Sequence, residues 1–143
     1  MPTLNAALDA SASGLAAERM RIEVAVSNLA NAESTRGPDG RPYRRRDVVL
    51  AAEPVASFND ALGRATATGV RVEQVIEDQA PGRRRYEPSH PDADKDGYVA
   101  LPNVDPAEEM VDMLSAARAY QANLTAISLI RDLMQRALEL GRG

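Results

Sequence analysis

The chain has 143 residues, a net charge of -4 and a hydrophobic content of 44%, with one Phe, four Tyr and no Trp. This length is enough for one modest domain, and the mild charge gives no sequence-wide attraction to nucleic acid or to an anionic membrane surface. The absence of cysteine excludes disulfides, thiolate catalysis and cysteine-based zinc sites. Residues 1–19 lack a basic stretch followed by an apolar run, so we expect no cleaved secretory signal, and no run of about 18 apolar residues is present to cross a bilayer.

The N-terminal zone, residues 1–32, predicts a long helix that lies against another helix. Between Leu4 and Ala32 the only residue that disfavours a helix is Gly14. Two asparagines near the end of this zone, Asn28 and Asn31, can cap the helix, hydrogen-bond a neighbouring chain or satisfy local backbone groups, and the sequence leaves these alternatives open. One apolar row recurs every seven positions, as in the seam of a coiled coil: Leu8, Leu15, Ile22 and Leu29.

The middle zone, residues 33–104, predicts a small β-rich insert. It contains seven of the nine prolines and six of the nine glycines, together with turn signals such as Asp96-Gly97. Residues Ser57–Thr68 are compatible with either a short helix or a loop. Alternation of apolar and charged residues and short β-favouring runs predict four strands, at Tyr43–Leu50, Val70–Ile76, Arg84–Tyr86 and Tyr98–Leu101.

The C-terminal zone, residues 105–143, predicts a second long helix. Asp105 is placed to cap its N-terminus, Pro106 suits the first helical position, and neither Gly nor Pro follows until Gly141. Pairing of this helix with the N-terminal one predicts an α+β protein whose two end helices form a coiled coil around a β-rich insert; the alternative is an ordinary helical hairpin over a small β domain. Two rows spaced by sevens form the predicted seam: Met113, Tyr120, Ile127 and Met134, beside Met110, Ala117 and Leu124.

The second helix is too apolar to be covered by one partner helix. No charged residue occurs from Ala119 to Ile130, and further leucines spread around the helix outside the seam, including Leu133 and Leu138. A helix that is apolar over so wide an arc must be buried on several sides, and a chain this short has few elements to bury it. We therefore expect other copies or related subunits to cover it. Insertion into a membrane is not expected, because the uncharged stretch is too short and too polar.

Motifs at both ends identify a resemblance. The runs Ser11–Leu15 and Ser27–Ala32 resemble the N-terminal signature of the flagellar rod, hook and hook-associated protein family. The run His90–Val99, with Pro102-Asn103-Val104 after it, and the helix segment Glu109–Asn123 resemble the proximal-rod members of that family. The resemblance covers the chain except for Glu53–Gly69.

The resemblance implies a structural subunit of the bacterial flagellar basal body. Such a subunit leaves the cytoplasm uncleaved through the flagellar type III export apparatus and polymerises in the periplasmic part of the rod. The partners it implies are further copies of the chain, other rod proteins and the adaptor at the base of the rod. The residues that we expect at the assembly interface are those of the two helices: Leu8, Leu15, Ile22, Asn28, Leu29, Asn31, Met110, Met113, Tyr120, Leu124, Ile127, Met134 and Leu138.

The run Asp92–Asn103 matches half of a calcium-binding loop. Asp92, Asp94, Asp96 and Gly97 have the spacing of the first half of an EF-hand, but Asn103 stands where a bidentate Glu is required. We expect instead an acidic turn whose side chains hold the loop or face a basic patch of a neighbour. No metal ion or other cofactor is expected.

Two arginine runs and the single histidine were the remaining candidates for binding or catalysis. The runs Arg44–Arg46 and Arg83–Arg85 are interpreted either as solvated strand faces or as partners for acidic groups of an adjacent subunit; nucleic-acid binding is not expected from an acidic chain without interleaved aromatics. His90 lies between two prolines without a nucleophile or metal-ligand spacing around it, so we expect it to pack in a turn. We expect no catalysis.

Two other classes of function compete with the structural subunit. One is a helical adaptor or export chaperone that binds a single partner through the C-terminal helix, and the other is a calcium-dependent binding module. A subunit enters an extended array, a chaperone stops at a small complex of defined size, and a calcium module responds to titration with the metal.

Overall fold

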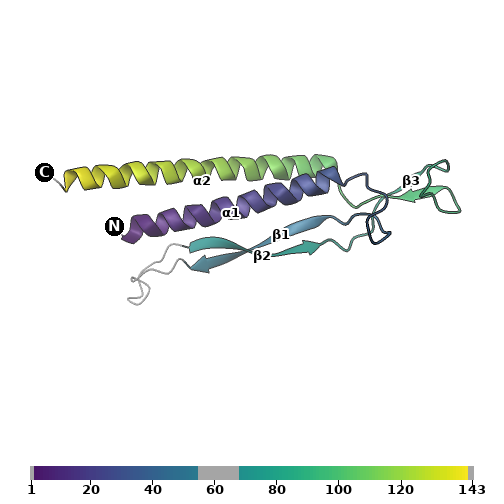
Figure 1. Cartoon of the computed structure of the whole chain (residues 1–143), viewed down its shortest axis with the longest axis horizontal. Helices are drawn as coiled ribbons and strands as arrows, with labels where there is room; N and C mark the ends of the chain where they lie inside the picture. Colours follow the sequence, from purple (N-terminus) through teal and green to yellow (C-terminus); the bar gives the residue numbers. More distant parts are fainter. Residues whose placement is uncertain (1, 55–67, 142–143) are drawn as a thin grey trace. The chain divides into compact units, whose positions relative to one another are not determined.

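The computed structural model describes residues 2–54 and 68–141 and contains two long helices and four strands (Figure 1). In chain order these are α1 (Pro2–Ala30), β1 (Arg46–Pro54), β2 (Thr68–Glu77), β3 (Arg84–Tyr86), β4 (Tyr98–Ala100) and α2 (Pro106–Leu140). Long helices at both ends and short sheets between them confirm the predicted α+β class. The helix or loop considered for Ser57–Thr68 falls outside the described residues, except that Thr68 begins β2.

The ends of both helices follow local backbone chemistry. At the start of α2, the Ala107 N–H donates to Asp105 Oδ1 over 2.8 Å, which confirms the predicted cap. At its end, the Gly141 N–H still reaches the carbonyl of Ala137 over 3.2 Å. α1 passes into a turn in which Asn31 donates its N–H to the carbonyl of Ser27 over 3.1 Å.

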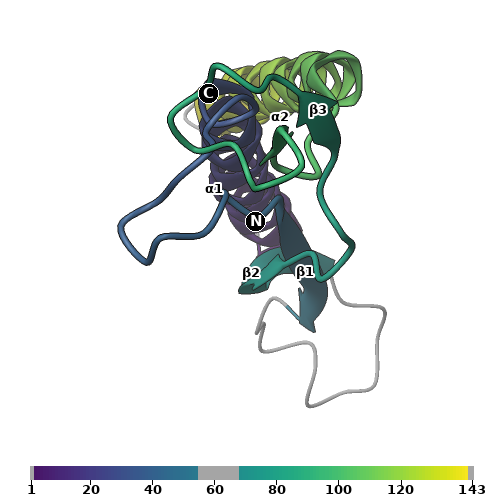
Figure 2. The ribbon, with the colours of Figure 1, turned by 90° about the vertical axis from the view of Figure 1, so that its right-hand side faces the viewer.

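The strands form two separate two-stranded sheets. β1 pairs with β2, and Figures 1 and 2 show the two strands side by side and running in opposite directions. β3 pairs with β4 in antiparallel register, with Arg85 opposite Val99. The predicted first strand began at Tyr43, but β1 begins at Arg46 because the Arg45 N–H donates to the side chain of Asn103 instead of to a strand.

Close packing divides the described chain into two units. Unit 1 contains residues 1–20, 49–74 and 115–143, and unit 2 contains residues 21–48 and 75–114. Each helix therefore contributes one part to each unit.

In unit 1, small residues bring α1 close to α2. A Cβ atom added to Gly14 would lie 2.9 Å from Nδ2 of Asn123, closer than unbonded atoms can approach. Ala6 and Ala17 of α1 and Ala116 of α2 are buried in the same unit. The neighbouring residue of α1, Ser13, accepts a hydrogen bond of 3.0 Å from the N–H of Val70 in β2. In unit 1, the fully buried positions of the two helices are thus small residues, and the larger apolar residues beside them are half-buried.

Unit 2 has a core of its own, in which larger side chains and polar groups are buried. Val99, Leu101 and Val104 are almost fully buried, together with Ala25 and Ala32. Gly97, which precedes β4, has a φ of 81° and so allows the tight turn between β3 and β4.

Candidate assembly interface

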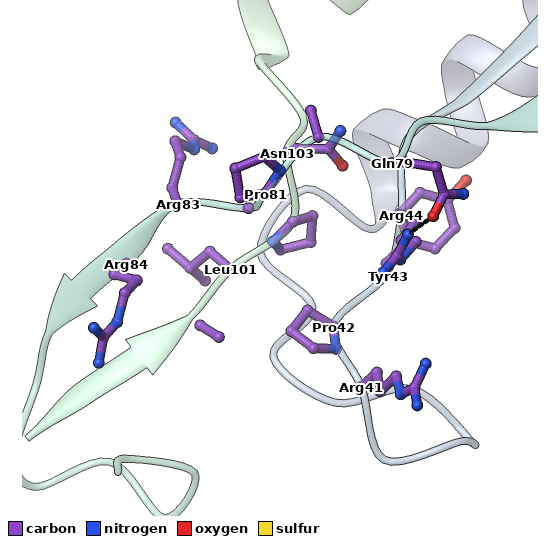
Figure 3. Close-up of a pocket in the computed structure, with 14 residues that line it drawn as sticks. Arg41, Pro42, Tyr43, Arg44, Gln79, Pro81, Arg83, Arg84, Leu101 and Asn103 are labelled. Carbon is purple, nitrogen blue, oxygen red and sulfur yellow. Dashed lines mark hydrogen bonds between the residues drawn. The ribbon is translucent and has the colours of Figure 1, made fainter. Parts of the chain in front are cut away.

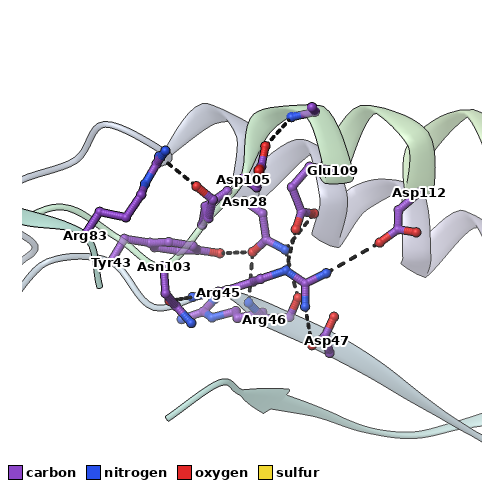
Figure 4. A network of polar contacts seen from close by, with 12 residues as sticks. Asn28, Tyr43, Arg45, Arg46, Asp47, Arg83, Asn103, Asp105, Glu109 and Asp112 are labelled. Carbon is purple, nitrogen blue, oxygen red and sulfur yellow. Dashed lines mark hydrogen bonds and ion pairs between the residues drawn. The ribbon is translucent and has the colours of Figure 1, made fainter. Parts of the chain in front are cut away.

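Glu109, in the first turns of α2, is the largest fully buried side chain of unit 2. Its side chain is 2% exposed, and both carboxylate oxygens are engaged. Oε1 accepts from Nε of Arg45 over 2.6 Å, and Oε2 accepts from Nδ2 of Asn28 over 3.0 Å (Figure 4). A carboxylate buried in this way is tolerated only when it is paired and hydrogen-bonded, and here both conditions are met.

Asn28, near the end of α1, uses all four of its side-chain hydrogen-bonding positions. Its Nδ2 also donates to the carbonyl of Arg46 over 2.8 Å. Its Oδ1 accepts from the hydroxyl of Tyr43 and from the N–H of Arg46, each over 2.9 Å. The sequence left open a helix cap, a neighbouring chain or local backbone groups as the partners of this amide, and the structure provides partners from distant segments of the same chain.

Arg45 completes this cluster, which we call the polar clamp and define as Asn28, Tyr43, Arg45, Arg46 and Glu109. The guanidinium of Arg45 also reaches Asp47 Oδ2 over 2.5 Å and Asp112 Oδ2 over 3.5 Å. Burial alone would lower the pKa of Arg45, but the hydrogen bond to Glu109 and the surrounding carboxylates outweigh it and raise the pKa. The clamp joins α1, α2 and the start of β1 within unit 2, and it needs the charged form of Arg45.

The clamp is not predicted by the sequence. There, Arg45 is interpreted as a solvated or intermolecular arginine, and Glu109 has no structural role. The partners of the clamp lie up to 81 residues apart in the chain, so no local pattern joins them. One signal in the sequence could have indicated it. Glu109 lies four residues before Met113 and so on the side of α2 that forms the predicted seam. A charged residue in a seam implies a buried partner.

The acidic turn before β4 is held by its own side chains, as expected. Asp94 Oδ1 accepts from the N–H of Tyr98 and of Asp96, each over 2.9 Å, and its other oxygen pairs with Arg84. The hydrogen bond from the Tyr98 N–H is the main cause that lowers the pKa of Asp94, with Asp96 and Arg84 adding to it.

The neighbouring Asp92 and His90 belong to the same turn. Asp92 accepts from the hydroxyl of Thr35 over 2.8 Å and pairs with Arg36 over 2.9 Å. The ring Nδ1 of His90 accepts from the Asp92 N–H over 3.1 Å, which agrees with packing in a turn. Within residues 2–54 and 68–141, no cluster of three or more His, Asp or Glu side chains is arranged to hold a metal ion.

On α1, the apolar residues that were expected at the interface are neither fully buried nor fully exposed. Leu8, Leu15, Ile22 and Leu29 are all half-buried, whereas Asn31 donates its side-chain N–H to the Ser27 carbonyl over 2.8 Å. The buried positions of α1 are small residues instead, such as Ala17 and Ala25. The row of large apolar residues therefore flanks the place where the helices meet.

The expected residues of α2 divide between two sides of the helix. The row of Met113, Tyr120, Ile127 and Met134 is half-buried. The second row predicted for the seam does not share that side: Met110 is 48% exposed and Leu124 is 45% exposed. The residues that do share the less exposed side with Met113 also recur every seven positions, and each lies one position before the second row or its continuation. They are Glu109, Ala116, Asn123, Ile130 and Ala137.

Among the described residues of the chain, no helix is long and apolar enough to cross a membrane.

Large apolar side chains of α2 point outward along much of its length. Leu140 is 85% exposed and Val111 is 65% exposed. These side chains are the candidate assembly surface, because contiguous exposed apolar patches mark sites of protein–protein contact. Its other members are Met110, Leu114, Leu124, Leu129, Leu133 and Leu138.

Comparison with known proteins places flagellar rod sequences at both ends of the chain. A family model described as flagella basal body rod protein matches residues 8–38. A second model, described as flagellar basal body rod FlgEFG protein C-terminal, matches residues 95–140. The two matches cover the zones whose motifs carry the resemblance.

Whole proteins of one kind match almost the entire chain. The flagellar basal-body rod protein FlgC of Salmonella typhimurium is 48% identical over 134 residues, which is 94% of this chain and 95% of the relative. FlgC of Borreliella burgdorferi is 40% identical over 98% of this chain and 99% of the relative. FlgC of Bacillus subtilis is 41% identical over 94% of this chain and 96% of the relative.

Proposed function

The chain belongs to the FlgC family of flagellar basal-body rod proteins, and we propose that it enters the rod through the outward apolar sides of its two long helices. It is a structural subunit of the basal-body rod, and its family is structural and not enzymatic. Membership of the rod implies contact with other rod components. The single observation that carries the proposal is the row of large apolar side chains left exposed on α2.

Within the subunit, we propose that α1 and α2 pair as an antiparallel coiled coil. Two contacts support this pairing, Gly14 with Asn123 in unit 1 and Asn28 with Glu109 in unit 2. From the first contact to the second, the step along α1 is 14 residues forward and the step along α2 is 14 residues back. The half-buried residues of α2 also alternate at spacings of four and three, as in a coiled-coil seam.

The surfaces outside this seam are the proposed assembly surfaces. In this reading residues 1–32 and 105–143 form the helical core of the subunit, and residues 33–104 form the outer β-rich region. The expected partners are further copies of the chain, other rod proteins and the adaptor at the base of the rod. Export through the flagellar type III apparatus into the periplasm completes the proposal.

The experiment replaces one of the exposed leucines of α2, Leu129, with aspartate. Leu129 is 59% exposed, so Leu129→Asp should change the free energy of unfolding of the soluble monomer by less than about 0.5 kcal/mol. In cells, the same substitution should abolish swimming and leave basal bodies without a completed rod, because a carboxylate cannot be buried unpaired between subunits.

Leu129→Met is the matched control, because it keeps an apolar side chain of similar volume and should preserve swimming. Normal rods built from Leu129→Asp protein would contradict the proposal. A monomer that unfolds because of the aspartate would contradict it too, since the leucine would then be needed inside the chain.

A further inference from the structure

The six arginines of the two basic runs divide into those with a carboxylate partner and those without. Arg46 pairs with Glu77, Arg84 with Asp94, and Arg85 with Glu33 and Glu87; Arg45 belongs to the polar clamp. Arg44 and Arg83 have only neutral partners among the described residues. Arg44 donates to the side-chain oxygen of Gln79, and Arg83 donates to the carbonyl of Val104 over 2.8 Å.

These two arginines line the same groove of unit 2, together with a third. The groove has a volume of about 210 Å³, and Arg41 also lines it. The exposed side chain of Arg41 pairs with no carboxylate in the described part of the chain. A separate concavity of about 640 Å³ shares Arg41, Arg44 and Gln79 with it but also contains Asp39 and Glu77. Figure 3 shows the arginines on the segments that border the first groove.

The lining of this groove, which we call the arginine groove, contains no acidic residue. Its fourth arginine, Arg84, is already neutralised by Asp94. In a chain with a net charge of -4, three guanidinium groups left without carboxylates in one concavity form a local positive field. The other lining residues are Pro42, Tyr43, Gln79, Ala80, Pro81, Gly82, Ala100, Leu101, Pro102 and Asn103.

One lining residue has a buried donor without an acceptor. Asn103 Oδ1 accepts from the Arg45 N–H over 3.1 Å, which fixes the orientation of the amide. The opposite atom, Nδ2, is buried and has no hydrogen-bond partner among the described residues. Buried donors are rarely left unpaired, so we expect an acceptor oxygen, from water or from a ligand, beside this atom.

The groove is also rigid, which favours an extended ligand. Pro42, Pro81 and Pro102 restrict the backbone on its sides, and the backbone at Gly82 is packed against the carbonyl of Leu101. Residues 42–45 lie outside both sheets. A groove whose backbone is already restricted loses little entropy on binding, and its three arginines can pair with several carboxylates of one segment.

We propose that the arginine groove binds an extended acidic segment of another protein of the rod. Carboxylates of that segment pair with Arg41, Arg44 and Arg83, because guanidinium groups and carboxylates match in charge and geometry. One oxygen of the segment accepts from Asn103 Nδ2. The proposal rests on the chain being a rod subunit, since it names a partner within the rod.

The acidic turn of a second copy does not fit this groove. Its two best-placed carboxylates, those of Asp92 and Asp94, are already occupied within their own chain. The remaining one, Asp96, stands beside Lys95. We therefore assign the groove to a different acidic segment, and the pairing of the arginine runs with this turn across subunits stays a prediction from the sequence.

The binding test uses the full-length chain and a fluorescent hexaglutamate peptide, measured by fluorescence anisotropy. The triple variant R41Q/R44Q/R83Q should bind at least about 30-fold more weakly than the unchanged chain. The variant R118Q/R131Q/R136Q removes three exposed charges from α2 and should keep the affinity within about twofold. Hexaglutamine should not bind.

Two further variants guard against misfolding of the triple variant. Arg41→Gln removes a side chain with no partner to lose, so it should fold normally and weaken binding about threefold to tenfold. Asn103→Asp keeps the oxygen that accepts from Arg45 but replaces the free donor with a carboxylate oxygen, so it should weaken binding by at least about tenfold. Equal affinity for the groove variants and the α2 variant would overturn the proposal. Arginine-dependent binding of inorganic polyphosphate without binding of hexaglutamate would overturn it too.

A test in cells separates this proposal from the proposed function. Arg41→Glu with Arg83→Glu should impair swimming, and suppressors should exchange an acidic residue for a basic one in another rod protein. Arg71→Glu, an exposed arginine of β2, is the control and should swim normally. If the double variant swims and builds rods as the unchanged chain does, the groove has no such partner, while the role of the chain as a rod subunit stands.

Discussion

The two units of the chain close their helix pairs by different means. In unit 2, α1 and α2 are joined by the polar clamp, in which a buried carboxylate and a buried amide satisfy each other and Arg45. In unit 1, the same two helices meet through Gly14 and buried alanines, while large apolar residues of α2 remain outside. The two units therefore differ in how their helices are joined, while both leave large apolar side chains exposed on α2, such as Val111 in unit 2 and Leu133 in unit 1.

This difference has a consequence for specificity and assembly. A satisfied polar cluster accepts only one arrangement of its members, because a shift by one residue leaves a buried charge unpaired. Exposed apolar side chains gain stability only when a neighbour covers them. We infer that the polar clamp sets the register of the two helices within unit 2, and that the exposed apolar side chains of α2 are covered on assembly.

The largest effect should come from removing the carboxylate of the clamp. Glu109→Ala leaves Arg45 and Nδ2 of Asn28 without their buried acceptor, so the free energy of unfolding should fall by about 3 kcal/mol. Urea denaturation of the soluble monomer measures it. Glu109→Gln is the control, because it retains an oxygen acceptor and should lose less than Glu109→Ala. A loss below about 1 kcal/mol for Glu109→Ala would mean that the clamp does not hold unit 2.

A smaller loss is expected from the amide of the clamp. Asn28→Ala removes four hydrogen bonds, including both that it makes with the backbone of Arg46, so we expect a loss of about 2 kcal/mol in the same urea titration. Asn31→Ala is the matched control on the same helix. Asn31 is half-buried and its amide has one local bond, so its loss should stay below about 1 kcal/mol. Equal losses for the two variants would remove the distinction between the clamp and the fraying end of α1.

The smallest effect should be the pH dependence from the acidic turn of unit 2. The folded pKa of Asp94 lies below its ordinary value of 3.8, so its contribution to stability is present above that value and is lost as the pH falls through the folded pKa. Asp94→Asn keeps the oxygen that accepts from the two backbone N–H groups but cannot ionise. Urea midpoints measured at a series of pH values should therefore fall less steeply with acid in this variant. A slope identical to that of the unchanged chain would show that Asp94 does not contribute.

Local signals in the sequence predicted most of the secondary structure. The cap at Asp105 and the absence of Gly and Pro placed α2 correctly, and alternation placed β2 and β3. β1 begins later than predicted because the side chain of Asn103, 58 residues away, takes the N–H of Arg45. Such a contact depends on the tertiary structure, and nothing in the local pattern indicates it.

The functional surfaces were predicted less completely, for the same reason. Periodicity indicated the half-buried row from Met113 to Met134 but also favoured Met110 and Leu124, which the structure places on the exposed side. The choice between adjacent rows depends on Gly14 and on Glu109, whose partners lie on the other helix. The role of these rows in assembly stays a prediction. The division of the arginines into paired and unpaired ones also needed coordinates, because their carboxylates come from several distant segments.

Hydrogen–deuterium exchange of the full-length monomer, read by mass spectrometry, tests the contrast between the units most directly. The backbone amides of residues 21–30 and 110–114 should be strongly protected, because they are hydrogen-bonded in the parts of the helices that the polar clamp holds, and these parts open only when unit 2 unfolds. Those of residues 124–140 should exchange at least about tenfold faster, because that part of α2 lacks cover from neighbours. Uniformly strong protection along the whole of α2 would contradict the account, since the monomer would then be complete without its neighbours.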